Sequence, residues 1–256
     1  MELIYHLAEP QHWATAETIG RYEQSTKGVP LAAADFVHAA DADQWPTVRQ
    51  RFYSDYEQDL FLLAIDPRRL DAEVKREVGD PETGEQFPHI YGPIDVDAVQ
   101  TVHTLHPTHD LPHDDAKTAS RSAVVIPNDV GTVWETLIDW QRAGRWLPGV
   151  NTITADGPTA VGTRLTYLTT DGAFVSTVTA VDRGSLLQIR SERDDITATH
   201  SFHLGRAFSE GRTATVLTLV AEVDGTASEA ALAQARADVG SADRRLPELL
   251  RGALTD

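Results

Sequence analysis

The sequence predicts an α+β protein of two domains, and three observations lead to this fold class. In the first part of the 256-residue chain, short strand patterns alternate with helical ones. The second part instead has a run of antiparallel strand patterns followed by a long amphipathic helix. Between the two parts lies a histidine-rich segment that prolines interrupt. We therefore expect a first domain over residues 1–105, a linker over 106–118 and a second domain over 119–256.

The first domain is expected to be a small split sheet with helices. The helices are predicted at Gln11–Ile19, which Gly20 closes, and at Gln44–Tyr56, where Pro46 suits a first turn. The continuous apolar run of Leu60–Ile65 is typical of a buried strand. The other predicted strands are Leu3–Leu7, Asp35–Ala40, VKREV (74–78) and VQTVHTL (99–105), and GDPETGEQ has turn composition.

The second domain is expected to open with a strand at Ser120–Ile126 and a helix capped by Pro127-Asn128-Asp129. The helix carries the apolar residues Val133, Trp134, Leu137, Ile138 and Trp140. Five strand patterns follow, namely GTRLTYLTT, FVSTVTAVD, SLLQIRSER, THSFHLGRA and TATVLTLVAEVD. Their expected joints are Asp171-Gly172, Arg183-Gly184, Glu210-Gly211 and Asp224-Gly225. Ser228–Leu254 is helical, and Pro247 is expected to bend or restart that helix.

Composition excludes several classes of partner. The formal net charge is −17, from 22 Lys and Arg against 39 Asp and Glu, and this argues against nucleic acid, which needs a basic face. The chain has no cysteine and therefore no disulfide or thiolate chemistry. It has no apolar run of about twenty residues, so we expect no integral membrane association. No signal-peptide pattern is present at the N-terminus, and a cytoplasmic location is expected.

The segment HTLHPTHDLPHDD, residues 103–115, holds four of the ten histidines. His106, His109 and His113 with the neighbouring aspartates have side chains that can ligate zinc, as a structural site or by weak adventitious binding. However, Pro107 and Pro112 prevent a helical face that would arrange ligands in advance. We therefore interpret the segment as a solvated linker and expect no metal.

The second domain is predicted to be a helix-grip, in which a curved antiparallel sheet wraps the long C-terminal helix. Residues 120–254, and above all the phrase IPNDVGTVWETLIDWQRAGRWLPGV, resemble the START-like SRPBCC superfamily, which includes polyketide cyclase/dehydrase and lipid-transport members. The resemblance implies a cavity for a small, largely apolar ligand such as an aromatic metabolite or a lipid, and such pockets have mostly apolar walls. The candidate wall residues, each of which is alternatively part of the core, are Trp146, Leu147, Tyr167, Phe174, Phe202, Leu217 and Leu246.

Two histidines in one strand raise the question of catalysis. His200 and His203 must face opposite sides of the sheet, and Phe202 shares the face of His200. An inward His200 is a candidate acid or base near neutral pH, with Glu192 and Glu222 as the only carboxylates that spacing suggests. The superfamily contains enzymes and pure binding proteins, so whether the chain is an enzyme stays open.

The first domain carries a second resemblance, on three phrases. IYHLAEPQHW opens the chain, DFVHAA stands where relatives typically read GFIHLS, and FPHIYGPIDVDAVQTV follows Glu77. With these phrases, residues 3–105 resemble the bacterial domain of unknown function family 952. That family is similar in fold to the ADP-ribosyltransferase superfamily, which implies NAD or ADP-ribose as a cofactor.

Carried over residue by residue, the resemblance implies that His6 binds the ribose side and His38 approaches the pyrophosphate or second ribose. The sequence departs from the family at Ala39-Ala40, which lacks a hydroxyl donor. In the transferases a glutamate activates the acceptor, and Glu77 is the only candidate for that position here. Arg21, Arg49 and Arg51 are the cations available to counter phosphate charge.

We expect His6, His38, His89 and Tyr91 to converge in one cleft, because buried polar groups must each find a partner. His6 and His38 should then lie within roughly 7 Å, which allows for a bridging water. The alternatives are a core role for His6 and a turn fixed by His89. Two functions follow: a small-molecule binding protein with an accessory N-terminal domain, or an ADP-ribosyl-using transferase whose C-terminal domain selects the substrate.

Overall fold

The computed structural model describes residues 2–81, 84–107, 111–112, 114–169 and 172–255. The chain forms two compact units. The first unit is Met1–Leu111 with Ala207–Arg212, and the second is Pro112–Arg206 with Thr213–Asp256. Across the described ranges, we find no helix with the length and apolar character needed to cross a bilayer.

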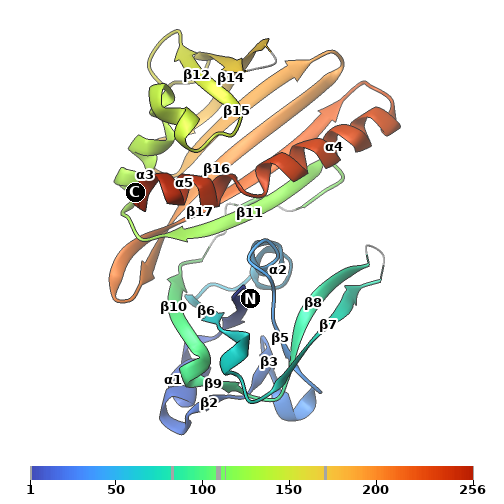
Figure 1. The fold of residues 1–256 in the computed structure, drawn as a ribbon, viewed down its shortest axis with the longest axis vertical. Coiled ribbons are helices and arrows are strands. Elements are labelled where there is room, and N and C mark those ends of the chain that lie inside the picture. The colour runs from blue at the N-terminus through green and yellow to red at the C-terminus, as the bar shows by residue number, and fades with distance from the viewer. Residues whose placement is uncertain (1, 82–83, 108–110, 113, 170–171, 256) are drawn as a thin grey trace. The chain divides into compact units, whose positions relative to one another are not determined.

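The first unit contains two small antiparallel sheets (Figure 1). One has the order β1-β6-β10, built from Ile4–Ala8, Leu60–Ile65 and Val99–Leu105. The other has the order β5-β8-β7, built from Val37–His38, Glu85–Tyr91 and Glu73–Asp80. A single antiparallel bridge between Tyr5 and Ala40 joins the ends of β1 and β5.

Helices and shorter strands complete the first unit. Helix α1 spans Pro10–Ile19 and ends at Gly20, whose φ of +86° favours glycine. Helix α2 spans Trp45–Tyr53. The two-stranded pairs are β2 with β9 and β3 with β4, covering Arg21–Tyr22, Ile94–Asp95, Gln24–Thr26 and Val29–Pro30. Single turns of 3₁₀ helix, η1, η2 and η3, lie at Leu31–Ala33, Pro67–Arg69 and Val96–Ala98.

One expected turn in this unit is wrong. His89 lies in the middle strand β8, opposite His38 of β5 and Lys75 of β7, and does not fix a turn. The proline at position 88 hid the strand, because proline is uncommon in the middle of a sheet. Similarly, the predicted turn GDPETGEQ is shorter than expected, since β7 extends to Asp80 and β8 begins at Glu85.

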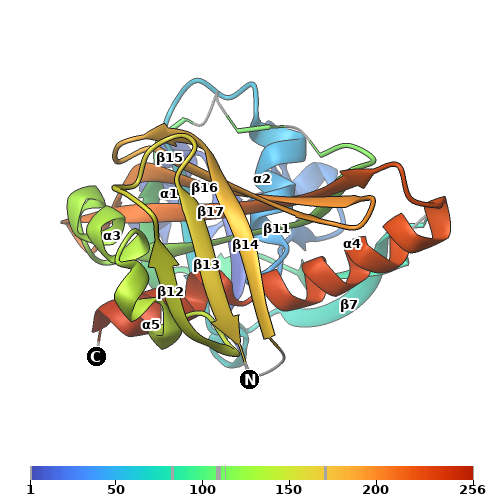
Figure 2. The same cartoon turned by 90° about the horizontal axis from the view of Figure 1, so that it is seen from above.

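The second unit contains one large antiparallel sheet in the order β11-β17-β16-β15-β14-β13-β12. The strands are Thr118–Ile126, Arg212–Gly225, Ile196–Ser209, Leu186–Arg193, Gly172–Asp182, Arg164–Thr169 and Val150–Ala155. Figure 2 shows helices α4 (Glu229–Asp243) and α5 (Leu246–Thr255) on one face of this sheet. Helix α3 (Val130–Leu137) and the 3₁₀ helix η4 (Trp140–Arg145) connect β11 to β12.

Most elements of the second unit agree with the sequence. Asp129 caps α3 by accepting a hydrogen bond from the main-chain N–H of Thr132. The C-terminal helix is interrupted just before Leu246-Pro247, as expected. Glu210 and Gly211 both have φ near the left-handed region, +51° and +71°, as a tight hairpin turn requires.

Other details of the second unit differ from expectation. Trp140 belongs to η4 and not to the first helix, and β12 was not expected. The β15–β16 turn falls at Asp194-Asp195, where Asp194 has φ +48°, and Asp224-Gly225 ends the last strand without joining a hairpin. Asp171, of the first expected joint, lies outside the described residues.

Each unit has its own hydrophobic core. In the first unit the core is built around Trp13, Tyr22, Leu63 and Ile90. In the second it gathers side chains from the sheet, α3, η4 and α5, including Trp134, Leu165, Leu187, Leu219 and Leu250. The resulting arrangement of a large antiparallel sheet with C-terminal helices on one face is that of a helix-grip.

Candidate functional site

The first unit contains a cavity of about 610 Å³. Its walls come from β1, β5, α2, β7 and β8, and they are mainly apolar and aromatic. Of the predicted cleft residues, His6, His38 and His89 line this cavity. Tyr91 and Glu77 are not among its lining residues. Both are linked to His89, because the carboxylate of Glu77 accepts hydrogen bonds from His89 and from Tyr91.

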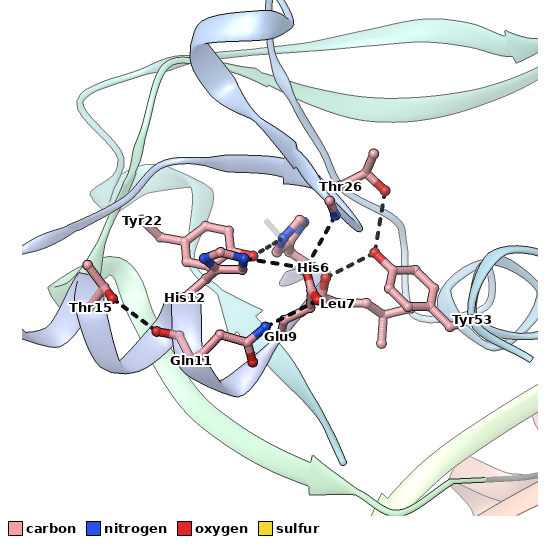
Figure 3. Close-up of polar contacts among 10 residues, drawn as sticks. His6, Leu7, Glu9, Gln11, His12, Thr15, Tyr22, Thr26 and Tyr53 are labelled. Atoms are coloured by element: carbon pink, nitrogen blue, oxygen red, sulfur yellow. Dashed lines mark hydrogen bonds and ion pairs between the residues drawn. The ribbon is translucent and has the colours of Figure 1, made fainter. Parts of the chain in front are cut away.

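His6 of β1 is buried and both its ring nitrogens are engaged. Figure 3 shows the contact between His6 and Tyr22. Nδ1 donates to the carbonyl oxygen of His38 at 2.7 Å, so it carries the hydrogen of the neutral ring. Nε2 then accepts from the hydroxyl of Tyr22 at 3.2 Å. Burial lowers the pKa of His6 to about 4, which keeps the ring neutral at pH 7. His6 therefore fixes the main chain of His38.

His38 of β5 lines the cavity, and one of its two ring nitrogens is hydrogen-bonded. The hydroxyl of Ser25 donates to the carbonyl oxygen of Phe36 at 2.6 Å and so must accept from Nδ1 of His38, 3.1 Å away. Nε2 of His38 thus carries the lone pair, and it has no hydrogen-bond partner within the described part of the chain. The pKa of His38 is lowered by burial first and by the nearby His89 second.

His89 of β8 lies beside His38, with 5.5 Å between the ring centroids. Its Nδ1 donates to Oε2 of Glu77 at 2.9 Å, and the hydroxyl of Tyr91 donates to the same oxygen at 2.7 Å. These two hydrogen bonds lower the pKa of Glu77, so its carboxyl is ionised at neutral pH. The ring of Phe36 stacks on His89 at 3.9 Å with an interplanar angle of 10°.

The structure thus brings three of the four predicted residues to one cavity. The direct contact between His6 and His38 passes through a main-chain oxygen and not between the two rings. Sequence reasoning missed Tyr22, Ser25 and Phe36, which set the hydrogen positions and orientation of the imidazoles. Tyr22 and Ser25 stand in none of the three family phrases, and only their packing identifies them, whereas Phe36 lies in the phrase DFVHAA.

The three arginines that were predicted to counter phosphate charge in this cleft lie in different environments. Arg51 lines the cavity, together with the acidic Glu85. Arg49 is buried, where it donates to the carbonyl oxygen of His106, and burial lowers its pKa to about 10. Arg21 is exposed and pairs with Glu23 at 2.8 Å. Arg51 is therefore the one candidate of the three that lines the cavity.

The second unit contains a smaller cavity of about 170 Å³. Its lining includes residues of α4 and α5 as well as the sheet, with mostly apolar surface. Seven of the eight predicted residues line it: Trp146, Leu147, Tyr167, Phe174, His200, Phe202 and Leu246. The eighth, Leu217, is fully buried in the core and does not face the cavity, because its side chain packs among neighbouring strands.

A polar pair stands in the wall of the smaller cavity. Nε2 of His200 lies 2.8 Å from Oδ2 of Asp243, the last residue of α4. The carboxylate partner of His200 is therefore neither Glu192 nor Glu222, and Glu192 instead pairs with Arg190 at 3.0 Å. A partner from the helix could not be found from strand spacing, which relates only residues of one sheet.

The remaining polar groups are held by neighbours or left unpaired. The hydroxyls of Ser176 and Ser191 are 2.9 Å apart. Tyr167 stacks on Phe174 at 4.5 Å, and burial raises the pKa of Tyr167 to about 12. In contrast, Nε1 of Trp146 is a buried atom without a hydrogen bond to any described residue.

The expectation about metal concerns a segment that is only partly described. His109, Asp110 and His113 lie outside the described residues. Nδ1 of His106 donates to Oδ1 of Asp59 at 2.7 Å, and Arg121 pairs with Asp114 at 3.0 Å. In the ranges that the structure describes, no three His, Cys, Asp or Glu side chains are grouped to hold a metal ion.

The fold and cavities define an α+β protein with a cleft of histidines in one unit and a helix-grip cavity in the other. A family model described as "Protein of unknown function (DUF952)" matches residues 7–102, which confirms the resemblance predicted for the first domain. No curated protein matches the chain.

Solved structures similar to this chain match about half of it. Truncated norcoclaurine synthase from Thalictrum flavum is 11% identical, and the match covers 56% of this chain and 98% of that one, with a TM-score of 0.42. The Zhui aromatase/cyclase from Streptomyces sp. R1128 is 12% identical, covering 53% and 92%, with a TM-score of 0.41. A START superfamily protein from Mycobacterium smegmatis is 14% identical, covering 53% and 95%, with a TM-score of 0.41.

Proposed function

We propose that the second unit binds a small apolar or aromatic molecule in the cavity bounded by the sheet, α4 and α5. The observation that carries the proposal is the unpaired Nε1 of Trp146 in a mainly apolar wall that also holds the His200–Asp243 pair. A cavity of about 150 Å³ is large enough for benzene. The 170 Å³ cavity therefore suits one substituted ring or a short chain of similar size.

The polar atoms of the wall define the polar groups of the ligand. A buried donor without a partner costs about 1–3 kcal/mol, and a ligand oxygen that accepts from Nε1 of Trp146 recovers this free energy on binding. The His200–Asp243 pair offers a second polar contact, to a ligand hydroxyl. We therefore expect the ligand to carry a carbonyl or ether oxygen and a hydroxyl group on an apolar frame, such as a phenolic carbonyl compound.

The test is a thermal-shift screen of the full chain with phenolic carbonyl compounds, the matching hydrocarbons and fatty acids. A bound ligand raises stability by RT ln(1 + [L]/Kd), so binding appears as a higher Tm. Trp146→Phe should weaken oxygenated ligands about tenfold and leave hydrocarbons unchanged. Trp134→Phe, a buried tryptophan outside the cavity wall, is the matched control. No shift with any compound would contradict the proposal.

The alternative function belongs to the first unit, as a transferase domain with an ADP-ribosyltransferase-like fold whose substrate the second unit selects. The observation in its favour is that His6, His38 and His89, from the three phrases of the resemblance, line one 610 Å³ cavity. Of the three arginines predicted to counter phosphate charge, Arg51 is the one in the lining. Glu77, the candidate acid, is already bonded to His89 and Tyr91.

Calorimetric titration with NAD and with ADP-ribose tests this alternative. Binding that His38→Ala and Arg51→Ala weaken would support it, whereas Arg21→Ala, at the surface, should have no effect. Titrations without heat, in conditions where the protein is folded, would remove NAD and ADP-ribose as ligands.

A further inference from the structure

The cavity of the first unit contains the imidazoles of His38 and His89, and these two rings have different hydrogen-bond partners. Neither of the functions proposed above makes use of this difference. We propose that this cleft is an acid–base site in which His38 removes a proton from a small, planar, uncharged substrate and His89 supplies one. The inference does not depend on the helix-grip cavity or on NAD binding. It rests on the hydrogen-bond partners of the two rings and on the composition of the walls.

His38 is held as a base. Its Nδ1 hydrogen is committed to Ser25, whose own hydrogen is committed to the carbonyl oxygen of Phe36. This chain of two hydrogen bonds leaves the lone pair on Nε2 of a ring that lines the cavity. Burial and the neighbouring His89 lower the pKa of His38, so the ring is neutral at pH 7. His6 is a positioning residue, since it bonds the main chain of His38 and has no nitrogen to spare.

His89 is held as an acid. The carboxylate of Glu77 accepts its Nδ1 hydrogen, which orients the ring. Nε2 has no hydrogen-bond partner among the described residues, and the protonated form of the ring carries there the hydrogen that an acid gives up. The ring lines the same cavity as His38. The stacked ring of Phe36 holds the imidazole plane in place. Because His38 and His89 are a register pair on β5 and β8, their 5.5 Å separation is built into the sheet.

The walls indicate what the two groups act on. Five aromatic residues other than histidine and Tyr5 line the cavity: Phe36, Trp45, Phe52, Tyr53 and Phe87. Flat aromatic walls favour a planar ligand. Apart from the histidines, the charged side chains in the lining are Arg51 and Glu85, one of each sign, so these two residues together give the lining no net charge that favours an ion. An uncharged planar substrate matches both features.

The reaction that two such groups support is a proton shift. Nε2 of His38 takes a proton from a C–H or O–H group, and the electron pair of that bond moves into the substrate. His89 gives its Nε2 proton to the oxygen on which the electrons accumulate, so the product is a tautomer of the substrate. Transfer of one proton from His38 to His89 through water restores both rings. The step needs no oxidant, reductant or second substrate.

The probe for this chemistry is 5-nitrobenzisoxazole, a planar uncharged compound. A base removes its ring C–H proton, the N–O bond breaks, and the phenoxide oxygen of the coloured 2-cyano-4-nitrophenol receives the electrons. With the full chain at pH 7, we expect a rate at least about 100-fold above that of equimolar imidazole. The rate should fall with pH as His38 is protonated, with a midpoint below 6.5, because its pKa is lowered.

Variants separate the two roles. His38→Asn keeps an amide N–H that donates to Ser25 but has no base. Its rate with 5-nitrobenzisoxazole should fall to the reference rate of equimolar imidazole or below. His89→Asn should lose about tenfold or more. His12→Asn, on α1 and outside the cavity lining, should match the wild type. Circular dichroism checks that each variant is folded.

A second measurement does not depend on the probe. ¹⁵N NMR at pH 7 should show His38 as the neutral tautomer protonated on Nδ1. A wild-type rate no greater than that of imidazole, an unchanged rate in His38→Asn, or a His38 tautomer protonated on Nε2 would each overturn the proposal. An unchanged rate in His89→Asn would overturn the assignment of His89 as the acid.

Discussion

His6 holds both of its ring nitrogens in contacts that only a neutral imidazole can make. A carbonyl oxygen accepts from Nδ1, and a tyrosine hydroxyl donates to Nε2. Protonation of Nε2 would turn this acceptor into a donor facing the hydroxyl of Tyr22, inside the core. The same burial that lowers the pKa of His6 to about 4 raises the pKa of Tyr22. Each ring is therefore kept uncharged at its position.

This burial gives the first prediction. In the unfolded chain His6 has its ordinary pKa of about 6.5, so on acidification the unfolded state gains the proton first. Stability is then lost between about pH 6.5 and pH 4, by roughly 3 kcal/mol in total from this residue. His6→Asn keeps a donor for the carbonyl oxygen of His38 but does not titrate. Denaturant unfolding across this pH range should show a smaller loss in the variant, and equal losses would contradict the prediction.

Glu77 gives a second prediction at this scale. The pKa of Tyr91 is raised, first by its hydrogen bond to the Glu77 carboxylate. Glu77→Gln removes the negative charge, so the pKa of Tyr91 should fall back toward 10. Ultraviolet titration of the tyrosines measures this shift. Glu73→Gln, on the same strand, removes a charge that acts on Tyr91 only at a distance, and it should have the smaller effect.

At the scale of elements, helix α4 approaches strand β11 through a glycine. A Cβ atom added at Gly240 would lie 2.6 Å from the carbonyl oxygen of Ala119, which is closer than a real Cβ contact allows. The helix therefore sits against the strand at a distance that only glycine permits. This contact also sets the position of Asp243, one helical turn further along, in the cavity wall.

Gly240→Ala is the prediction that follows. Alanine favours an isolated helix by about 1 kcal/mol over glycine, yet here the clash with a main-chain oxygen should give a net loss of about 1–3 kcal/mol. Gly252→Ala in α5 is the control, because a Cβ there meets nothing within 4 Å and should stabilise the protein. Denaturant unfolding measures both. A stabilised Gly240→Ala would show that α4 packs more loosely than described.

At the scale of the whole molecule, the two units have separate hydrophobic cores and the segment near residue 106–118 passes between them in the sequence. The described part of that segment is anchored to the neighbouring strands of its own unit. Arg121, which is buried, pairs with Asp114 and donates to the carbonyl oxygen of Pro112. His106 is bonded to Asp59 and to Arg49.

We predict that limited proteolysis of the full chain cuts first between His106 and Lys117. The bonds of Arg121 narrow the expected site to the residues before Pro112. Mass spectrometry of the early fragments identifies the cut, and calorimetry of the nicked protein should still show cooperative unfolding. Earlier cuts elsewhere, or loss of all folded structure on cleavage, would contradict the prediction of two independently folded domains.

Local patterns determined much of this fold. The bounds of two strands, Leu60–Ile65 and Val99–Leu105, were predicted as the structure has them. A continuous apolar run and an alternating pattern each depend only on adjacent side chains, so both can be recognised in the sequence. Gly20 marked a helix end, and Pro247 marked an interruption, because each residue restricts its own backbone. By the same reasoning Pro88 misled, since three strands' pairing outweighed its local preference.

The sequence by itself determined the class of fold, the histidines of one cleft and most wall residues of one cavity, because these follow from periodicity and family phrases. Only the tertiary structure decided which side chains are hydrogen-bonded or paired with each other. Asp243 reaches His200 from a helix 43 residues later in the chain, and Ser25 fixes the hydrogen of His38 from another strand. Such partners are chosen by chain closure and packing, which no local pattern records, and they decide where each proton lies.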